Sequence, residues 1–442
     1  MGLKYGTMTA SQRDPLGVGL LGVGVVGTVV AQALLDGRTQ ETVPGSHPLV
    51  LKQAAIRDLD KDRSVPSDLL TSDVSSVVNN PEVDIVVELM GGEEPATASI
   101  AAALKSGKHV VTANKEAIAK NGDELIALAE ANGVRLLYEA AVGGGIPIIG
   151  PLSSDLLANR IQSLRAIING TTNYILTQMT AQGEAFDDIL ADAQALGYAE
   201  ADPSADVDGW DAMYKIAILA RLAYGASVPL DSIHREGIRP VTAADISNAA
   251  TLGYTIKLIA AARLEDGGLL VRVHPALIPN DVPMAKVDGV LNVCEIEGDL
   301  VGPLWLQGRG AGPDATASAV LGDIIRVARA PGSITPPRKL ISPPALLEMS
   351  DYQCQYYLRL VVKDQPGVLA KVAGILADRN ISIDSVLQMD SDPERGTADI
   401  VLTTHPARER EVQQAVEQIS AVSSVEKFAS LLRIEPYGDS SG

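Results

Sequence analysis

The sequence has little cysteine, with only Cys294 and Cys354 among 442 residues. Two cysteines cannot build the disulfide framework of a small secreted domain, and their scarcity fits a reducing cytoplasm. The polar segment Met1–Pro15 lacks the apolar stretch of a signal peptide, so we expect a short disordered lead-in. Histidine is also rare, with 5 residues and no pairing with cysteine at zinc-ligand spacing. We therefore expect neither a secreted disulfide scaffold nor a transition-metal site.

Long apolar runs and positive charge are scarce as well. No run of about 18 apolar residues occurs, so no transmembrane helix is expected. Lysine and arginine number 36 against 55 acidic residues, and the formal net charge of −19 repels the phosphates of a nucleic acid. The apolar fraction of 46% is enough for ordinary cores, and the length suggests roughly two to four domains. These features predict an acidic cytoplasmic enzyme with neither a membrane nor a nucleic-acid partner.

The first part of the chain alternates short β-branched runs with Ala/Leu-rich helical stretches. Strands that alternate with helices at this spacing predict βαβ units around a parallel sheet, and thus an α/β fold. The expected strands are Val18–Gly22, Leu51–Ile56, Asp84–Leu89, His109–Thr112 and Val134–Glu139. We place this domain at residues 16–150, and we expect a Gly/Ala-rich segment and helix at about 309–335 to complete it.

A glycine motif follows the first expected strand. Gly22, Gly24 and Gly27 form G-x-G-x-x-G, with Val25 and Val26 between the last two glycines. The first glycine permits the tight turn, the second lets a pyrophosphate approach the backbone, and the third lets helix and strand pack closely. The helix that follows offers free N–H groups to phosphate. The segment predicts a Rossmann-type dinucleotide site, and the alternative is a glycine-rich turn that binds nothing.

The end of the second strand bears on which dinucleotide binds. An acidic residue there favours the ribose 2′-hydroxyl of NAD, whereas Arg57 suits the 2′-phosphate of NADP. Asp58, one residue later, keeps NAD possible. We expect NADP with NAD as a possible substitute, unless Arg57 is merely a solvated charge.

The remainder of the chain contains two further regions with different sequence patterns. Residues 151–308 mix helices with strand-like runs, which predicts an α+β domain. A proline-rich linker, placed at residues 336–355, separates this domain from residues 356–435, which predict a β-α-β-β-α-β order. In the first helix of this last region, expected at Val368–Asp378, apolar residues recur on one face, and Asn380 is a suitable stop.

The segment Ala193–Lys215 carries the strongest catalytic signal. Asp211 and Lys215 are four residues apart and share one face of an expected helix. A surface ion pair is the ordinary interpretation, but Met213, Ile216 and their neighbours make this helix apolar almost all round. A lysine with several carboxylates on a buried helix indicates either a functional site or a satisfied internal pair.

Several motifs together resemble the homoserine dehydrogenase family. The ordered pattern Ala193, Gly197, Asp202-Pro203, Asp206, Gly209, Asp211 and Lys215 matches the family signature. The runs Val111–Glu116, Ile168–Tyr174 and Gly308–Val320 resemble its lysine motif, its glycine–threonine loop and the segment that returns to the cofactor domain. The resemblance covers about Leu16–Ala330 and implies reversible hydride transfer between L-homoserine and L-aspartate 4-semialdehyde. It also implies that residues 151–308 bind substrate and dimerise.

The resemblance assigns roles to individual residues. Catalytic roles fall to Lys215 as general acid/base, to Lys115 as its partner at cofactor and substrate, and to Asp211 as an orienting group. Substrate contacts are implied for Glu200, Asp206, Gly170 and Thr171, and a cofactor contact for Gly310. A lysine can act as acid/base near neutral pH if burial or a second cation lowers its pKa. The alternative for Lys115 is a lysine at a helix start paired with Glu116.

A triple-glycine segment follows the last strand of the first domain. In Glu139–Ile146, backbone oxygens could surround a hard cation, although composition alone equally fits a flexible hinge. The resemblance implies a structural sodium or potassium ion held by Glu139, Val142, Gly144 and Ile146.

The C-terminal region opens with Asp364-Gln365-Pro366-Gly367-Val368, which resembles the start of an ACT domain, a ferredoxin-like module that often binds amino acids. The resemblance implies L-threonine as an effector, with the amides of Gly367 and Val368 available to its carboxylate. The alternative is a dimerisation module without a ligand. We expect a homodimer or homotetramer, because sheet-containing domains and ACT modules commonly pair.

Two other functions compete with this interpretation. An aldehyde dehydrogenase needs a nucleophilic cysteine, and neither Cys294 nor Cys354 lies in a suitable glycine/serine-rich elbow. Whether Cys354 is redox-sensitive is left open. A non-catalytic NADP and amino-acid sensor would bind cofactor without turnover, but the presence of Glu200, Asp211 and Lys215 argues against it. We expect no fused aspartokinase, because only a short segment precedes the first expected strand.

Overall fold

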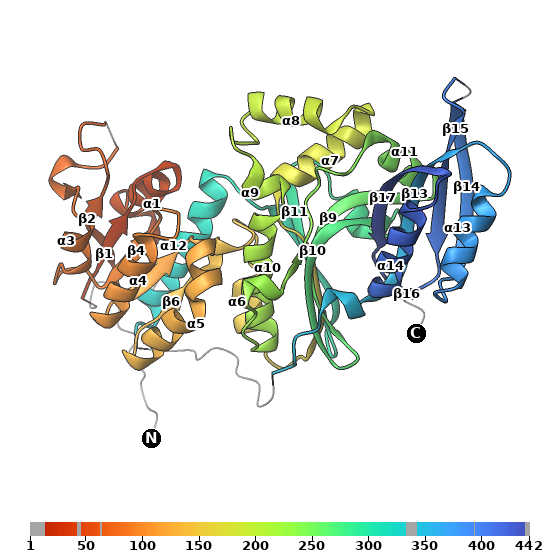
Figure 1. Cartoon of the computed structure of the whole chain (residues 1–442). Coiled ribbons are helices and arrows are strands. Elements are labelled where there is room, and N and C mark those ends of the chain that lie inside the picture. The colour runs from red at the N-terminus through yellow and green to blue at the C-terminus, as the bar shows by residue number, and fades with distance from the viewer. Residues whose placement is uncertain (1–13, 42–45, 62–63, 333–342, 393, 438–442) are drawn as a thin grey trace. The chain divides into compact units, whose positions relative to one another are not determined.

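The computed structural model describes residues 14–41, 46–61, 64–332, 343–392 and 394–437, and these form two compact units (Figure 1). Unit 1 comprises residues 1–164, 214–230 and 293–343, and unit 2 comprises 165–213, 231–292 and 344–442. The expected lead-in Met1–Pro15 lies almost wholly outside the described residues, as does about the first third of the expected linker.

A parallel sheet lies at the centre of unit 1. Its strand order among the described residues is β3-β2-β1-β4-β5-β6. These strands are β1 (Leu16–Leu21), β2 (Leu49–Ala55), β3 (Leu70–Thr71), β4 (Ile85–Glu88), β5 (His109–Thr112) and β6 (Leu136–Leu137). The order is that of a dinucleotide-binding doubly wound sheet, which switches direction between β1 and β4. The Rossmann-type α/β fold expected from the sequence is confirmed.

Unit 1 also contains helices from distant parts of the chain. They are α1 (Val25–Leu35), α2 (Arg38–Glu41), α3 (Val74–Val78), α4 (Ala96–Lys105), α5 (Lys115–Ala131), α6 (Ile149–Ser153) and α12 (Pro313–Arg329). Figure 1 shows α12 beside α1, and Val320 and Ile324 share one buried core with Val30 and Leu34. Strands β11 (Leu291–Gly298) and β12 (Gly302–Arg309) lead into α12. Every helix in the described ranges is too short or too polar to span a membrane.

Unit 2 contains a mixed sheet flanked by helices. Its strands run in the order β9 (Tyr254–Glu265), β10 (Gly268–Pro279), β17 (Val425–Ile434), β13 (Gln353–Lys363), β15 (Thr397–Thr404) and β14 (Ile383–Asp392). Its helices include α7 (Gly170–Gln182), α8 (Phe186–Ala195), α9 (Ser204–Val207) and α11 (Ala243–Thr251). Strand β7 (Ile161–Ile167) and helix α10 (Trp210–Tyr224) each contribute residues to both units.

The C-terminal part of unit 2 follows the expected β-α-β-β-α-β order. Helix α13 (Val368–Ala377) follows β13, and α14 (Glu409–Ser420) precedes β17. Val368, Val372 and Leu376 are the buried face of α13, as their four-residue spacing predicts. Asn380 adopts a left-handed φ of 56° just after this helix, which confirms it as part of the stop. The ferredoxin-like ACT module is therefore confirmed.

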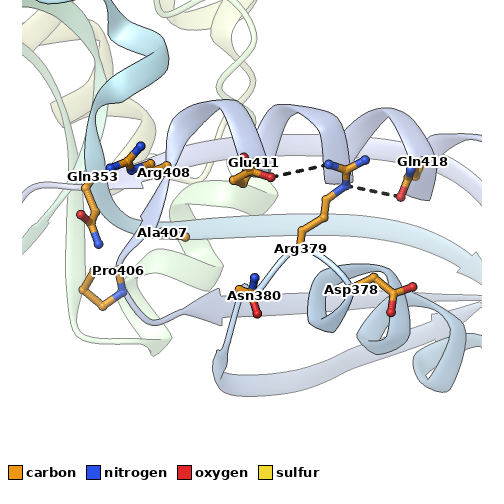
Figure 2. A pocket seen from close by; sticks show the side chains of 9 residues that line it. All are labelled: Gln353, Asp378, Arg379, Asn380, Pro406, Ala407, Arg408, Glu411 and Gln418. Atoms are coloured by element: carbon orange, nitrogen blue, oxygen red, sulfur yellow. Dashed lines mark hydrogen bonds and ion pairs between the residues drawn. The ribbon is translucent and has the colours of Figure 1, made fainter.

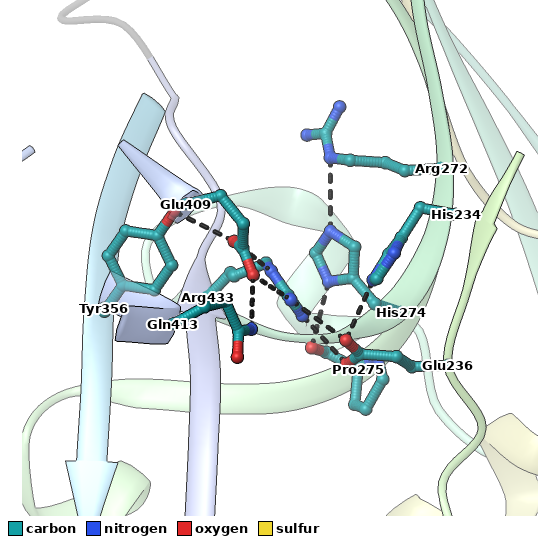
Figure 3. Close-up of polar contacts among 9 residues, drawn as sticks. All are labelled: His234, Glu236, Arg272, His274, Pro275, Tyr356, Glu409, Gln413 and Arg433. Atoms are coloured by element: carbon teal, nitrogen blue, oxygen red, sulfur yellow. Dashed lines mark hydrogen bonds and ion pairs between the residues drawn. The ribbon is translucent and has the colours of Figure 1, made fainter. Parts of the chain in front are cut away.

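A network of ion pairs joins this module to β10 and to Glu236, and Figure 3 shows the part of it around Arg433. Arg272 on β10 donates from Nη2 to both oxygens of Glu435, at 2.6 and 2.8 Å. Arg433 on β17 donates to Glu409 on α14 at 2.6 and 2.9 Å and to Glu236 at 2.8 and 2.9 Å. Strands β10 and β17 pair in parallel beside these side chains. Charges this deeply buried must be paired, so the network fixes how the ACT sheet continues into the middle domain.

Candidate active site

The glycine motif forms the turn between β1 and α1. Gly22 has a φ of +101°, and a Cβ there would lie 2.8 Å from the Leu89 oxygen. A Cβ on Gly27 would lie 2.2 Å from the Gly22 oxygen, so only glycine lets the helix approach the strand. Gly24 has open space around it, and Val25 is 73% exposed at the first turn of α1. The turn therefore combines tight packing inside with an accessible helix N-terminus, which suits a pyrophosphate.

Arg57 lies at the same edge of the sheet. The amide of Gly22 donates to the oxygen of Ala55, the last residue of β2, at 2.9 Å. Arg57 and Asp58 follow two and three residues later, and both are exposed. This position is where the ribose of a dinucleotide is recognised in a Rossmann fold.

Lys115 is the first residue of α5, at the same carboxyl-terminal edge. Asn114 caps this helix by accepting the Ala117 amide at 3.0 Å. The neighbouring Glu116 pairs with Lys120 at 2.7 Å. Glu88, which the sequence analysis did not single out, is fully buried at the end of β4 and accepts the Thr112 hydroxyl. The sequence signal that could have identified Glu88 is an acidic residue at the end of an apolar strand, shortly before a pair of glycines.

Helix α10 is buried as its composition predicts, since Met213 and Ile216 are almost inaccessible. Asp211 is also buried, and Lys215, one helical turn later, is half-buried. Asn169 donates from Nδ2 to Asp206 Oδ1 at 2.7 Å and to Asp211 Oδ2 at 2.9 Å. Asn169 thus gathers two of the predicted site carboxylates, a role that the sequence analysis did not assign to it.

The remaining predicted substrate residues lie near the start of α7. Gly170 is the first residue of this helix, and Asn169 caps it by accepting the Thr172 amide. The hydroxyl of Thr171 donates to the Tyr198 oxygen at 2.8 Å. This contact holds the loop after α8, in which the side chain of Glu200 is exposed. The loop can therefore present Glu200 to a soluble cationic group.

The Glu139 carboxylate has a different environment from the expected one. It accepts amide hydrogens from Ile148 and Ile149 at Oε1 and from Gly150 at Oε2, at 2.7–2.8 Å. Arg326 also donates to Oε2, at 3.1 Å. These four donors use the acceptor positions that a carboxylate offers. A cation at this loop would therefore be held by backbone oxygens rather than by this side chain.

The glycine loop after Glu139 packs on the segment that returns to the cofactor domain. Gly144 has a φ of +52°, and a Cβ there would lie 2.5 Å from the Gly310 oxygen. The amide of Gly145 donates to the Arg309 oxygen at 3.2 Å. Gly310 is buried in this contact and precedes the N-terminus of α12. Within the described residues, three or more His, Cys, Asp or Glu side chains nowhere converge as a metal site would require.

The ACT module has two features that bear on ligand binding. Gly367, with a φ of +90°, is the N-cap of α13, and no described side chain caps this end of the helix. A cavity of about 620 Å³ lies at the opposite end of this helix. Figure 2 shows Arg379 within it, directed toward Glu411 and Gln418 on α14.

Comparison with known families accounts for most of the chain. Residues 22–139 match the NAD-binding domain of homoserine dehydrogenase, residues 147–325 match the homoserine dehydrogenase domain, and residues 356–423 match the ACT domain. The described fold of each region agrees with these matches.

Whole-length relatives give the same result. The chain is 44% identical to a homoserine dehydrogenase of Synechocystis sp., over 94% of this chain and 99% of the relative. It is similar to the crystal structure of a homoserine dehydrogenase from Thiobacillus denitrificans, with a TM-score of 0.89 and 42% identity over 96% of this chain and 99% of that one. A hyperthermophilic archaeal homoserine dehydrogenase in complex with NADPH is 29% identical, with a TM-score of 0.62, and covers 73% of this chain and 99% of its own. The chain therefore belongs to the homoserine dehydrogenase family and is an NAD(P)-dependent oxidoreductase with a C-terminal ACT domain.

Proposed function

We propose that Lys215 is the general acid/base of hydride transfer between L-homoserine and L-aspartate 4-semialdehyde. The observation that carries this proposal is the pair of bonds from Asn169 to Asp206 and Asp211, with Lys215 one turn beyond Asp211 on α10. Asp211 is held by a neutral amide, so it can orient a lysine on its own helix face. Lys215 takes the proton from the substrate hydroxyl in oxidation and returns it to the oxygen in reduction.

Other residues have binding and orienting roles in this proposal. Glu200 and Asp206 bind the ammonium group of the substrate. Gly170 and Thr171 also contact the substrate. Lys115 contacts cofactor and substrate from the start of α5, where its cation stabilises negative charge on the carbonyl oxygen. When bound, the reduced cofactor NADPH would supply the hydride in the reductive direction, and NADP+ would accept it in the oxidative direction. In this proposal the phosphates and ribose of the cofactor would be held by Gly22, Gly24, Val25, Val26, Gly27 and Gly310.

The first test compares Lys215→Met with Lys52→Met in homoserine-dependent reduction of NADP. Lys52 is a partly exposed lysine paired with Glu82 in the same unit. Loss of a general acid/base is expected to lower kcat by about 100- to 10,000-fold, and the control is expected to stay within twofold. Cofactor binding without turnover in the wild-type chain would instead favour a sensor, and wild-type turnover in Lys215→Met would remove this lysine from the mechanism.

Cofactor preference is assigned to Arg57. Its exposed position after β2 suits the 2′-phosphate, so NADP is proposed as the preferred cofactor with NAD as a possible one. Arg57→Ala is expected to raise the KM for NADP by about tenfold and to leave the KM for NAD within twofold, in line with loss of one charge-assisted contact. Equal changes for both cofactors would show that Arg57 does not discriminate between them.

A structural sodium or potassium ion is proposed at the Glu139–Ile146 loop. The Glu139 carboxylate is occupied by four donors, so the fit is to main-chain oxygens of Glu139, Val142, Gly144 and Ile146. The thermal midpoint in sodium or potassium chloride is expected to exceed that in tetramethylammonium chloride of equal ionic strength. Equal midpoints in all three salts would remove the ion from the proposal.

L-Threonine is proposed as an effector at the Gly367–Val368 amides. Arg379→Gln separates this turn from the cavity at the other end of α13, because Arg379 lines the cavity and its side chain contacts α14. Inhibition by threonine is expected in the wild type and is expected to be unchanged in Arg379→Gln. Loss of inhibition in that variant would instead place the effector in the cavity.

We also propose a cytoplasmic homodimer or homotetramer. Light scattering would test this by comparing the mass in solution with the 46.2 kDa of one chain.

A further inference from the structure

Glu88 lies at the carboxyl end of a central strand of the parallel sheet, which is the edge where such sheets bind ligands. It is the last residue of β4, and its neighbours across the sheet are Leu21 at the end of β1 and Thr112 at the end of β5. Ligands of doubly wound sheets bind beyond the carboxyl ends of the strands, near the switch between β1 and β4. Glu88 nevertheless has an exposed fraction of 0%.

The carboxylate is held by hydrogen bonds instead of by a cation. Oε1 accepts the Met90 amide at 2.7 Å and lies 3.4 Å from the Gly91 amide, and Oε2 accepts the Thr112 hydroxyl at 2.6 Å. Among the described residues, no lysine, arginine or histidine forms an ion pair with Glu88. Burial raises the pKa of this carboxyl, and the donors from Thr112 and Met90 oppose the rise.

These bonds extend to the start of α5. Thr112 Oγ1 accepts the Asn114 amide at 3.0 Å, and Asn114 Nδ2 donates to the Gly92 oxygen at 2.6 Å. The Asn114 side chain also caps the helix that Lys115 begins. One carboxylate therefore ties the loop after β4 to the loop after β5.

The loop after β4 also contacts the dinucleotide turn. The Leu89 amide donates to the Leu21 oxygen at 2.8 Å, and a Cβ on Gly22 would lie 2.8 Å from the Leu89 oxygen. Gly91 and Gly92 both have a φ of +74°, a conformation that glycine adopts readily and other residues do not. A shift of this loop would therefore change both the cofactor turn and the cap of α5.

We propose that Glu88 is a positioning residue for hydride transfer. It holds residues Leu89–Gly92 against the dinucleotide turn and sets the start of α5, from which Lys115 extends. A carboxylate suits this task because it accepts several donors at once, whereas an amide would present a donor to one of them. This inference rests on the role proposed above for Lys115.

The test pairs Glu88→Gln with Lys108→Met. Lys108 is also buried, and it donates to backbone oxygens of Asn80 and Val83 at the opposite edge of the same sheet. Both variants are expected to lower the thermal midpoint, because each removes a buried hydrogen-bonding group. Only Glu88→Gln is expected to lower kcat, by about 10- to 100-fold, since misplacement of reacting groups by about 1 Å has effects of this size. The dissociation constant of NADP is expected to rise by less than the fall in kcat, because the loop contacts the dinucleotide turn through Leu89 but also sets the cap of the helix from which Lys115 extends.

Thr112 supplies a second route that does not depend on the folding of Glu88→Gln. Thr112→Ser keeps the hydroxyl that Glu88 accepts, and Thr112→Val removes it. Thr112→Val is expected to lower kcat at least fivefold, and Thr112→Ser is expected to retain kcat within twofold. Equal losses in the two variants, or equal losses of kcat in Glu88→Gln and Lys108→Met, would reduce Glu88 to a fold-stabilising residue.

Lys115→Met separates this inference from the function on which it rests. If Lys115→Met keeps wild-type kcat, the role proposed for Lys115 fails, whatever Glu88→Gln does. If both single variants lose activity, the double variant is expected to lose little more than Lys115→Met, because Glu88 acts through the placement of that lysine. Fully multiplicative losses would overturn the positioning role.

Discussion

Two buried carboxylates in this chain are stabilised in different ways. Glu88 in unit 1 is held by hydrogen bonds from a hydroxyl and backbone amides, without an ion pair in the described structure. Glu409 in unit 2 is held by the guanidinium of Arg433, with further donors from Tyr356 and Gln413 (Figure 3). A cation neutralises a buried anion most fully, so its absence at Glu88 must have another reason.

The difference follows from what each carboxylate connects. Glu409 and Arg433 join a helix to a strand inside the ACT module, where rigid packing is the requirement. Glu88 connects two loops at an edge where a dinucleotide must approach the backbone. A large guanidinium there would fill space at the cofactor edge, whereas amides and a hydroxyl occupy none beyond the loops themselves. We therefore expect loss of the ion pair to affect stability most and loss of the Glu88 contacts to affect catalysis most.

The largest expected effect on stability comes from Arg433→Met. This variant leaves Glu409, which is 3% exposed, as a buried anion without its cation. Breaking such a pair is expected to lower the free energy of unfolding by about 3–5 kcal/mol, measured by urea unfolding. The double variant Arg433→Met/Glu409→Gln is expected to recover part of this loss, and kcat of the folded fraction is expected to stay within twofold. A loss below about 1 kcal/mol would show that the pair does not hold the module.

His274 supplies the next prediction, which concerns pH. Arg272 Nε donates to its Nε2, so its proton is on Nδ1, which donates to the Pro275 oxygen. Burial, together with the nearby charges of Arg433 and Arg272, lowers the pKa of His274 to about 3, although Glu236 and Glu435 oppose the shift. In the unfolded chain His274 binds a proton as the pH falls below about 6.5, whereas in the folded chain it stays neutral until the pH is near 3. The stability of the fold is therefore lost as the pH falls from about 6.5 toward 3.

The slope of this loss is expected to be about 1.4 kcal/mol per pH unit in the wild type. His274→Gln can keep both hydrogen bonds and cannot titrate, so the stability of this variant relative to wild type is expected to rise as the pH falls below 6.5. Urea unfolding at several pH values between 7.5 and 5 measures the difference. A constant difference across that range would show that His274 titrates normally in the folded chain.

The titration of Asp323 in unit 1 is expected to change the stability of the fold with pH in the opposite direction to that of His274. Its burial raises the pKa to about 7, although the Glu139 amide and Arg326 donate to it. Between an unfolded pKa near 3.9 and the folded value, the folded chain holds a proton that the unfolded chain has released. Stability from this group is therefore present at low pH and lost as the pH rises through about 7. Asp323→Asn, which cannot titrate, is expected to gain stability relative to wild type as the pH rises from 5 to 7.5, and an invariant difference would contradict the raised pKa.

These residues show what the sequence could and could not predict. The G-x-G-x-x-G turn, the buried helix with Asp211 and the α13 stop at Asn380 are local patterns, so they were found without the structure. Asn169 and Glu88 depend on contacts between separate segments. Asn169 reaches Asp211, 42 residues away, and Glu88 reaches Thr112, 24 residues away. Arg272 reaches Glu435, 163 residues away, and Arg433 reaches Glu236, 197 residues away, and spacing cannot indicate such pairs.

The same limit applies to the predicted cation loop. The glycines of Glu139–Ile146 correctly suggested a backbone-rich segment, but the sequence could not show that α6 and α12 already saturate the Glu139 carboxylate. Only the arrangement of three separate elements reveals which oxygens remain for an ion.

The smallest expected effect comes from an exposed pair in unit 1. Lys52 and Glu82 lie 3.1 Å apart, with side-chain exposures of 30% and 69%. Water screens such a pair, so Lys52→Met is expected to change the free energy of unfolding by less than about 1 kcal/mol. This variant sets the baseline for the comparison between Glu409 and Glu88, because it removes a charge without burying another. A loss as large as that of Arg433→Met would mean that burial is not what separates these carboxylates, and the contrast between the two units would then need a different cause.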